Sequence, residues 1–367
     1  MSDDSQVALH YSILRTGSSQ GLFLLGASLP ADIRGRDRLL IAAAGSSRWR
    51  PRGEISEGNA TALKLAIVSR SWRQGIDVEY LYAEIALDAP KVEVPLEFGK
   101  LLAGVPAFAI ESGIVAARDG TTPIFVYNIN TGHTVAAHIP TSDGKVNYTA
   151  DISRASFSSQ SSADIRIDFV KTAGSVCGAL LPTGRVTDNL GSSKATLIDN
   201  GEPLVIVRAE ELGGSVHETA LELANDVRLK SRSEELRRAA GQLMKLGDVR
   251  GRAIPRITLI AAPQRGGVIS ALTLTPPKYE AAPTVGCLEV ITVGAACILP
   301  GSTAAGIVSL PNGPIKRLVL EYPSDEFLVE IELEGMASEV NVLRSSLVCS
   351  AQMQLKSEIL IPTAVLD

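Results

Sequence analysis

The alternation of apolar and polar positions predicts a strand-rich first half. Residues 78–87, 122–129 and 133–140 are rich in β-branched and aromatic side chains, and Gly, Pro, Asn or Asp bound them. We expect one helix after Pro30 and a second over residues 99–115. The second helix is apolar almost all round, which predicts that other elements wrap it on every side.

The second half of the chain repeats this plan. Residues 195–213 predict strands and a turn, residues 217–251 a charged helix, and residues 283–302 another apolar segment of helical length. Two similar halves, each a mixed or antiparallel β-layer around a central apolar helix, make an α+β fold. We expect a first domain over residues 1–183, to which a strand at 351–367 returns, and a second over 184–350.

Composition and charge narrow the classes of protein. The chain has 367 residues, of which 45% are hydrophobic and 20% charged, so it is globular and long enough for two domains. A net charge of −5 predicts no nucleic-acid or membrane partner. The basic residues between 228 and 252 alternate with Glu and Asp, which is typical of a solvated helix face.

The cysteines and the chain start predict a reducing, cytoplasmic environment. The first residues are acidic and polar and do not resemble a signal peptide, and no apolar run reaches the ~20 residues of a spanning helix. The four cysteines are widely spread, which disfavours a disulfide framework or a zinc site. We interpret Cys287, near the start of the second apolar helix, as a structural residue.

The common cofactor motifs are absent from the sequence. It contains no GxxxxGK[ST] loop, no GxGxxG after a strand, no HExxH and no GxSxG, and its four histidines lack metal-ligand spacing. We therefore expect neither cofactor nor metal. Cofactor-free chemistry on a small molecule, binding and scaffolding stay open.

Seven segments in order carry a family resemblance: LRTGSSQGLFL, GNATALKLAIV, GKLLAGVPAFAIESGIV, LLPTGRVTDNLGSSKATLIDNGEP, LRRAAGQLMKLG, AACILPGS and YPSDEFLVEI. Together they resemble the 2-methylaconitate cis–trans isomerase and aconitate Δ-isomerase family. The resemblance spans nearly the whole chain and implies the diaminopimelate-epimerase-like fold. It also implies a site in the cleft between the two domains.

The resemblance assigns residue roles. Lys64 falls at a basic position of the family, where a desolvated amine is a usable base, although it could instead anchor a carboxylate or point into water. Ser18 and Ser19 would polarise a carbonyl or an acid. The implied substrate-binding residues are Gln20, Asn59, Thr61, Phe98, Gly99, Lys100, Met244, Tyr322 and Ser324.

Two departures from the family pattern shape the functional expectation. Phe98 stands where the family has a Cys at the start of the buried helix, and a phenyl ring cannot move a proton. Tyr322 and Asp325 replace the outer residues of a His-Pro-Ser-Gly segment, and an Asp there would repel a substrate carboxylate. Both changes favour a larger and less charged substrate, which the shape of the site would hold in place of charged groups.

Three functions follow from these observations. The preferred one is a cofactor-independent cyclase or pericyclase of secondary metabolism, which folds an unsaturated natural-product intermediate, for example for a Diels–Alder-type cycloaddition. The first alternative is a 1,3-proton-shift C=C isomerase of a small unsaturated carboxylic acid, with Lys64 as the base. The second alternative is a non-catalytic binding or partner protein. Exposed strand edges leave room for a homodimer.

Overall fold

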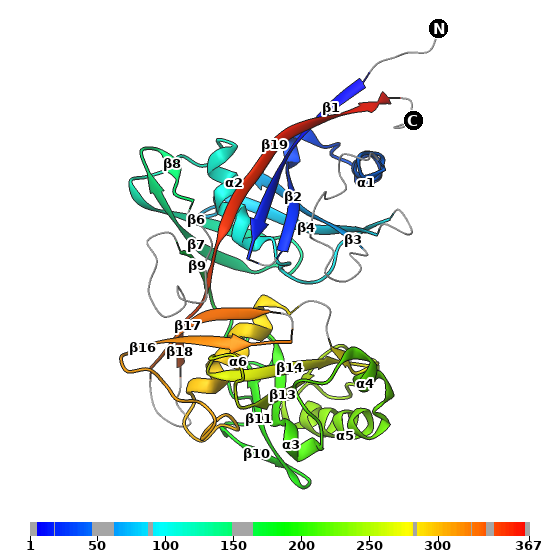
Figure 1. Cartoon of the computed structure of the whole chain (residues 1–367), viewed down its shortest axis with the longest axis vertical. Coiled ribbons are helices and arrows are strands. Elements are labelled where there is room, and N and C mark those ends of the chain that lie inside the picture. Colours follow the sequence, from blue (N-terminus) through cyan, green and yellow to red (C-terminus); the bar gives the residue numbers. More distant parts are fainter. Residues whose placement is uncertain are drawn as a thin grey trace. The chain divides into compact units, whose positions relative to one another are not determined.

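The computed structural model describes residues 6–17, 19–45, 62–86, 91–148, 164–281, 285–323, 325–334 and 341–363. The chain divides into two compact units (Figure 1). Unit 1 comprises Met1–Ile167 and Cys349–Asp367, and unit 2 comprises Asp168–Val348. Strands predominate over helices in both, so the expected mixture of α and β elements is confirmed.

The sheet of unit 1 begins with the strand nearest the C-terminus. Its order is β19 (Ala351–Pro362), β1 (Gln6–Thr16), β2 (Ser19–Leu25), β3 (Ala62–Arg70), β4 (Val78–Ala86), β6 (Gly120–Asn128) and β7 (Thr134–Ser142). Neighbours are antiparallel except for two parallel pairs, β2 with β3 and β4 with β6. Three shorter strands complete the unit or adjoin it: β5 (Val92–Glu93), β8 (Lys145–Val146) and β9 (Ile165–Phe169).

Helices lie on the two faces of the unit 1 sheet. On one face α1 (Ile33–Ala44), which follows the 3-10 turn η1 (Gly26–Ser28), packs with the apolar side chains of β1 to β4. The Asp32 side chain caps α1 by accepting a hydrogen bond from the Gly35 N–H at 2.8 Å. The other face carries the 3-10 turn η2 (Leu102–Gly104) and the apolar helix α2 (Val105–Glu111).

The helix expected over residues 99–115 is shorter than predicted. Gly99 and Gly113 have φ angles of 67° and 73°, outside the helical range, and so bound the segment. Between them the chain makes a 3-10 turn before α2, and Pro106 occupies the first turn of α2, where a missing N–H costs no hydrogen bond. The apolar composition correctly predicted burial: residues 105–109 are all buried.

The sheet of unit 2 follows the same plan. Its order is β10 (Asp188–Leu190), β11 (Ser193–Asp199), β12 (Pro203–Arg208), β13 (Arg256–Ala261), β14 (Ile269–Thr275), β16 (Ile315–Glu321), β17 (Glu326–Glu334) and β18 (Asn341–Cys349). Again two pairs are parallel, β12 with β13 and β14 with β16. The short β15 (Glu280–Ala281) pairs with β14.

Helices again occupy both faces of the sheet. On one face, side chains of α3 (Ala209–Leu212), α4 (Ala220–Asn225) and α5 (Val227–Leu243) join the apolar core of β10 to β14. The other face packs against α6 (Cys287–Ile298), in which every residue from Glu289 onward is buried. The expectation of an apolar helix at this place in the sequence is therefore confirmed. None of the helices in the described ranges is long and apolar enough to cross a membrane.

The strand registers make specific residues of the two units equivalent. Val78 opens the parallel pairing of β4 with β6, and Ile269 opens that of β14 with β16. Ala83 and Leu274 each lie five residues after these starting points. Their partners on the neighbouring strands β3 and β13 are Leu65 and Ile257. The residues that precede these partners, Lys64 and Arg256, are therefore equivalent.

Candidate functional site

Lys64 lies on the α2-facing side of the unit 1 sheet. Leu63 and Leu65, its neighbours on β3, point into the core beneath α1, and alternation along a strand turns Lys64 to the opposite face. Glu84 on β4 lies directly opposite Lys64, so the two side chains share that face. Both are half-buried. This geometry places a cation and a carboxylate side by side.

Tyr82 connects Glu84 to the segment that precedes α2. Its hydroxyl donates a hydrogen bond to Glu84 Oε1. Burial, reinforced by that hydrogen bond, holds the pKa of the Tyr82 phenol far above its usual value, so it stays protonated. The α-carbon of Gly99 packs directly on the Tyr82 ring, and a Cβ at that position would overlap the ring. Gly99 therefore brings the start of the buried segment onto the face that carries Glu84.

The turn between β1 and β2 joins the same neighbourhood. The Thr16 hydroxyl donates to the Lys100 carbonyl oxygen at 2.9 Å, and Gly21 packs closely on the Leu101 side chain. Ser19 is buried in this turn. The structure thus brings together four of the sequence-predicted residues: Ser19, Lys64, Gly99 and Lys100. Glu84 and Tyr82 were missed.

Phe98 is a packing residue in this structure. Its side chain is only 2% exposed, and its ring lies 6.2 Å from the His133 ring, centroid to centroid. This burial gives no support to the substrate contact expected of Phe98. Gln20, expected to bind substrate, has its side-chain amide hydrogen-bonded to the Gln354 side chain. Four other expected residues lie outside the described ones: Ser18, Asn59, Thr61 and Ser324.

Met244 and Tyr322 lie in the interior of unit 2. Met244 follows α5 and is fully buried in the apolar core of that helix, so the structure does not support a substrate contact. The Tyr322 ring is 2% exposed and stacks edge-on against Phe327 at 5.6 Å. Both residues were expected from the sequence resemblance, which does not indicate whether a side chain is buried.

The turn that follows Tyr322 also differs from expectation. The sequence analysis expected Asp325 to make it repel carboxylates. Arg265 reaches the same turn and donates hydrogen bonds to the carbonyl oxygens of Tyr322, Pro323 and Asp325. The guanidinium therefore adds a positive charge at this turn, and it also pairs with Glu326 at 3.3 Å. These residues border a small cavity of about 140 Å³.

Arg256 of unit 2 has a different environment from its equivalent, Lys64. Its guanidinium forms ion pairs with Glu202 and, at 3.4 Å, with Glu289, and its side chain is 15% exposed. Glu289 lies in the first turn of α6 and is fully buried. Burial raises the pKa of Glu289 to about 7, although the charge of Arg256 opposes that rise.

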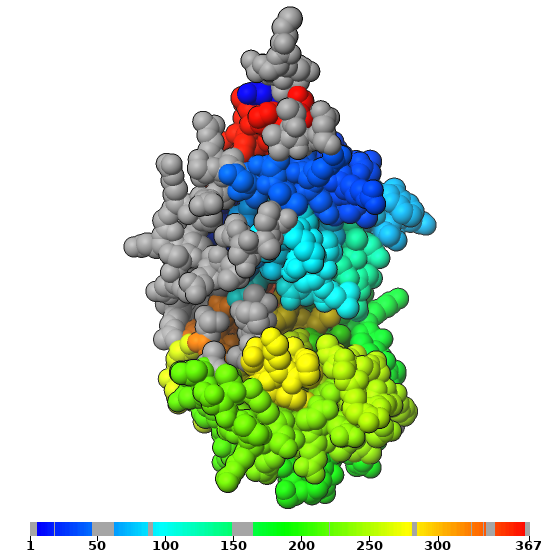
Figure 2. Space-filling model, turned by 90° about the vertical axis from the view of Figure 1, so that its right-hand side faces the viewer, coloured from blue at the N-terminus to red at the C-terminus, as the bar shows by residue number. Residues whose placement is uncertain are grey.

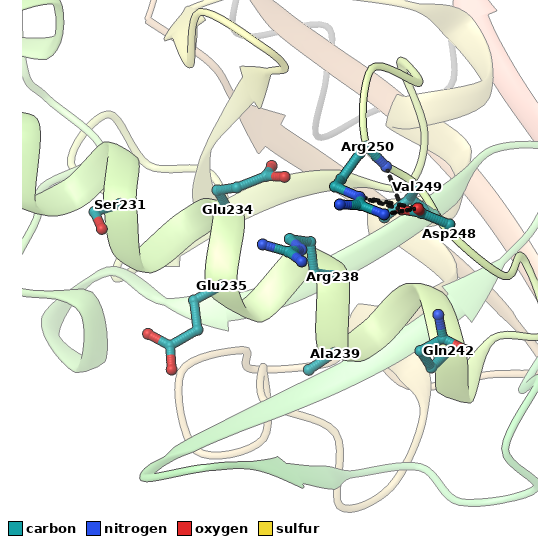
Figure 3. Close-up of a pocket in the computed structure, with 9 residues that line it drawn as sticks. All are labelled: Ser231, Glu234, Glu235, Arg238, Ala239, Gln242, Asp248, Val249 and Arg250. Atoms are coloured by element: carbon teal, nitrogen blue, oxygen red, sulfur yellow. Dashed lines mark hydrogen bonds and ion pairs between the residues drawn. The ribbon is translucent and has the colours of Figure 1, made fainter.

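A charged groove of about 680 Å³ runs along α5 (Figure 3). Glu234, Glu235, Arg238, Asp248 and Arg250 line it, and Asp248 pairs with Arg250. Acidic and basic side chains alternate there, as expected of a solvated face. The groove contains none of the candidate residues.

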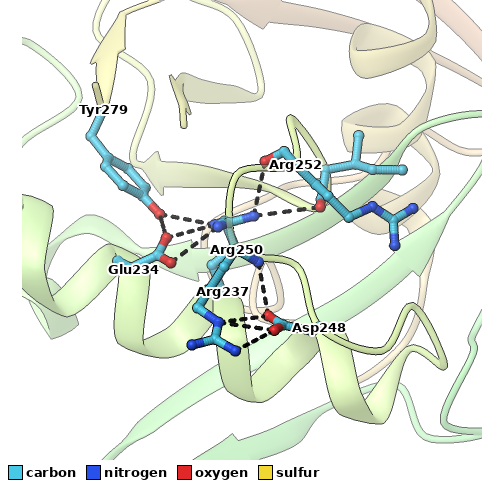
Figure 4. Close-up of polar contacts among 7 residues, drawn as sticks. Glu234, Arg237, Asp248, Arg250, Arg252 and Tyr279 are labelled. Atoms are coloured by element: carbon cyan, nitrogen blue, oxygen red, sulfur yellow. Dashed lines mark hydrogen bonds and ion pairs between the residues drawn. The ribbon is translucent and has the colours of Figure 1, made fainter. Parts of the chain in front are cut away.

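Arg237 of the same helix departs from that expectation. Its side chain is only 1% exposed and pairs with Glu234 at 2.8 Å (Figure 4). It also contacts the Tyr279 hydroxyl at 2.9 Å and carbonyl oxygens of the chain that follows α5. Arg237 therefore turns inward and links α5 to neighbouring segments, which a count of charges cannot reveal.

The cysteines of the described residues are free thiols. Burial raises the pKa of Cys177, Cys297 and Cys349 to about 12, so these thiols stay protonated near neutrality. Cys287, the first residue of α6, is half-buried. Within the ranges that the structure describes, no three His, Cys, Asp or Glu side chains gather as a metal site would require.

Comparisons with known proteins test the resemblance stated from the sequence. The model of the family described as "PrpF protein" matches residues 6–362. The 4-oxalomesaconate tautomerase of Pseudomonas putida is 37% identical over 344 residues, which cover 92% of this chain and 94% of that protein. The (4E)-oxalomesaconate Delta-isomerase of Novosphingobium sp. is 37% identical over 328 residues, which cover 89% and 91%.

A solved structure supports the fold independently. The crystal structure of a methylitaconate-delta-isomerase aligns over 99% of this chain and 97% of its own, with a TM-score of 0.74 and 23% sequence identity. The resemblance stated from the sequence is therefore confirmed. The preferred expectation of a cyclase or pericyclase of secondary metabolism is wrong, because these relatives carry the names of isomerases and tautomerases of small unsaturated acids.

Proposed function

Because the chain belongs to the PrpF family, we propose that it catalyses a 1,3-proton shift that moves a C=C bond in a small unsaturated carboxylic acid of the oxalomesaconate type. The observation that carries this proposal is the 37% identity to a 4-oxalomesaconate tautomerase across nearly the whole length of both chains. The isomerase class itself is common to the named relatives.

The residues around Lys64 fit such a reaction. Removing a proton from the carbon beyond the C=C bond of an unsaturated acid leaves a dienolate. A cation or aligned hydrogen-bond donors must stabilise its negative charge. Lys64 supplies a cation on a half-buried face, and the buried hydroxyl of Ser19, the first residue of β2, is a candidate donor. No step of the shift needs a redox or metal cofactor, because it only relocates one proton and one double bond.

The proposal is tested by following the double bond directly. The purified chain is incubated separately with 4-oxalomesaconate, 3-methylitaconate and 2-methylaconitate, and each product is identified by NMR. We expect conversion of at least one acid, and a loss of that conversion in the Lys64→Ala variant. No conversion of any of the three, at enzyme concentrations comparable with the acid, would rule the proposal out.

A further inference from the structure

The reaction needs a group that takes a proton from one carbon and returns it to another. Phe98, at the start of the buried segment, offers only a ring. Lys64 would have to be a neutral amine to accept a proton, yet it stands directly opposite Glu84. Glu84 places a carboxylate on this face, and a positioned carboxylate can accept and return a proton.

We propose that Glu84 is the catalytic proton carrier of this site and that Lys64 acts as a cationic anchor. The assignment rests on the proposed function and specifies how its site works. Directly opposed residues of antiparallel strands have Cβ atoms about 5 Å apart, so one small acid can contact both side chains at once. Lys64 would hold the substrate carboxylate, and Glu84 would lie within reach of the two carbons between which the proton moves.

The Tyr82 hydrogen bond supports this assignment because it fixes one oxygen of the carboxylate. Tyr82 is fully buried and its ring packs on Gly99, so its hydroxyl is a rigid donor to Glu84 Oε1. A donor held in this way orients the carboxylate before substrate binds. The second oxygen, Oε2, is the atom to which we assign the transferred proton.

Two further carboxylates, Glu93 and Glu97, occur in this part of unit 1. Glu93 on β5 lies opposite Glu84 on the same face, one strand farther from Lys64, and pairs with Lys91 at 3.3 Å. The charge of Glu97 is one of the causes that raise the pKa of Tyr82. Of these carboxylates, Glu84 is the one placed opposite the cation.

The proposed step balances without a further reactant. A C–H bond of the carbon beyond the double bond breaks, its proton goes to Glu84 Oε2, and its electron pair spreads into a dienolate beside the Lys64 ammonium. The double bond shifts as Glu84 returns the proton to the carbon next to the carboxylate. The carboxylate and the ammonium end in their starting forms.

The decisive variant is Glu84→Gln, which keeps an acceptor for the Tyr82 hydroxyl but cannot carry the proton. We expect kcat to fall about 10²–10⁴-fold with a small change in KM. Glu84→Asp retains a carboxylate and should keep more activity than Glu84→Gln. Glu93→Gln, on the same face, is the control and should stay within about threefold of wild type. Thermal melting of each variant checks that it is folded.

Lys64 variants separate an anchor from a base. An arginine keeps the charge but cannot act as a base near neutrality. We expect Lys64→Arg to retain at least ten times the turnover of Lys64→Met. A Glu84→Gln variant with kcat within threefold of wild type would overturn the assignment and leave the proposed function standing. Wild-type protein that converts none of the acids would overturn both.

Discussion

Lys64 and Arg256 occupy the same place in the two repeats and have different surroundings. Arg256 is held between two carboxylates and is largely withdrawn from solvent. Lys64 lies opposite Glu84 on a half-buried surface. The same strand position therefore holds a cation paired with two carboxylates in unit 2 and, in unit 1, a half-buried cation that we propose as the substrate anchor.

The buried helices show the same contrast. The segment leading into α2 has Gly99 packed on Tyr82 and no buried acid within the helix. The first turn of α6 carries Glu289, whose burial is compensated by Arg256. A buried charge is tolerated when it is paired, at the cost of fixing both partners in place. In unit 2 the buried charges at this place are paired with one another, whereas the proposed site of unit 1 has a half-buried cation opposite a half-buried carboxylate.

The largest expected effect on activity follows from removing the positive charge of Lys64. Lys64→Met should lower kcat/KM on the converted acid by about 10³-fold or more, because the dienolate loses its neutralising charge. The melting temperature should change little, since the side chain is half-buried. Steady-state kinetics and thermal melting of the same preparation check both. A variant with wild-type kinetics would make Lys64 an ordinary strand residue.

The matching change in unit 2 should act on stability instead. Arg256→Met leaves Glu202 and Glu289 without their partner, and breaking a buried ion pair costs about 3–5 kcal/mol. Urea unfolding measures the loss, and kinetics below the unfolding transition should stay near wild type. Equal loss of activity in the folded Arg256→Met protein would erase the contrast between the repeats.

Glu289 should make stability fall between about pH 5 and pH 8. Its raised pKa means that the folded state holds a proton that the unfolded state releases, so stability is fully present below the unfolded pKa and is lost as pH rises through about 7. Glu289→Gln should flatten this dependence, a difference on the order of 1–3 kcal/mol. Urea midpoints at the two pH values test it, and an unchanged slope in the variant would contradict it.

Tyr82→Phe should have a smaller effect on turnover than Lys64→Met. It removes the donor to Glu84 Oε1 while keeping the ring on which Gly99 packs. A hydrogen bond to a charged group contributes about 1.5–3 kcal/mol, so we expect kcat to fall about tenfold or somewhat more. A fall in kcat with unchanged KM would support a positioning role. An unchanged kcat would show that Glu84 needs no fixed donor.

The sequence predicted the parts of the fold that local pattern controls. The apolar character of residues 105–109 and of α6 indicated burial, and alternation indicated the strands. The role of Glu84 could not be predicted, because a Glu on an alternating strand is typical of a solvent face until its partner strand is known. The expected substrate contact of Met244 failed for a similar reason, since burial depends on tertiary packing. The domain limits of 1–183 and 184–350 stay a prediction.

The central claim is that a C–H bond of a small unsaturated acid breaks as its double bond moves. It is tested most directly with 4-oxalomesaconate that carries deuterium on the carbon that loses hydrogen in the shift. With wild-type protein we predict, by NMR, that deuterium leaves that carbon in step with the movement of the double bond. A double bond that does not move, or complete retention of the label on that carbon while product forms, would contradict the claim.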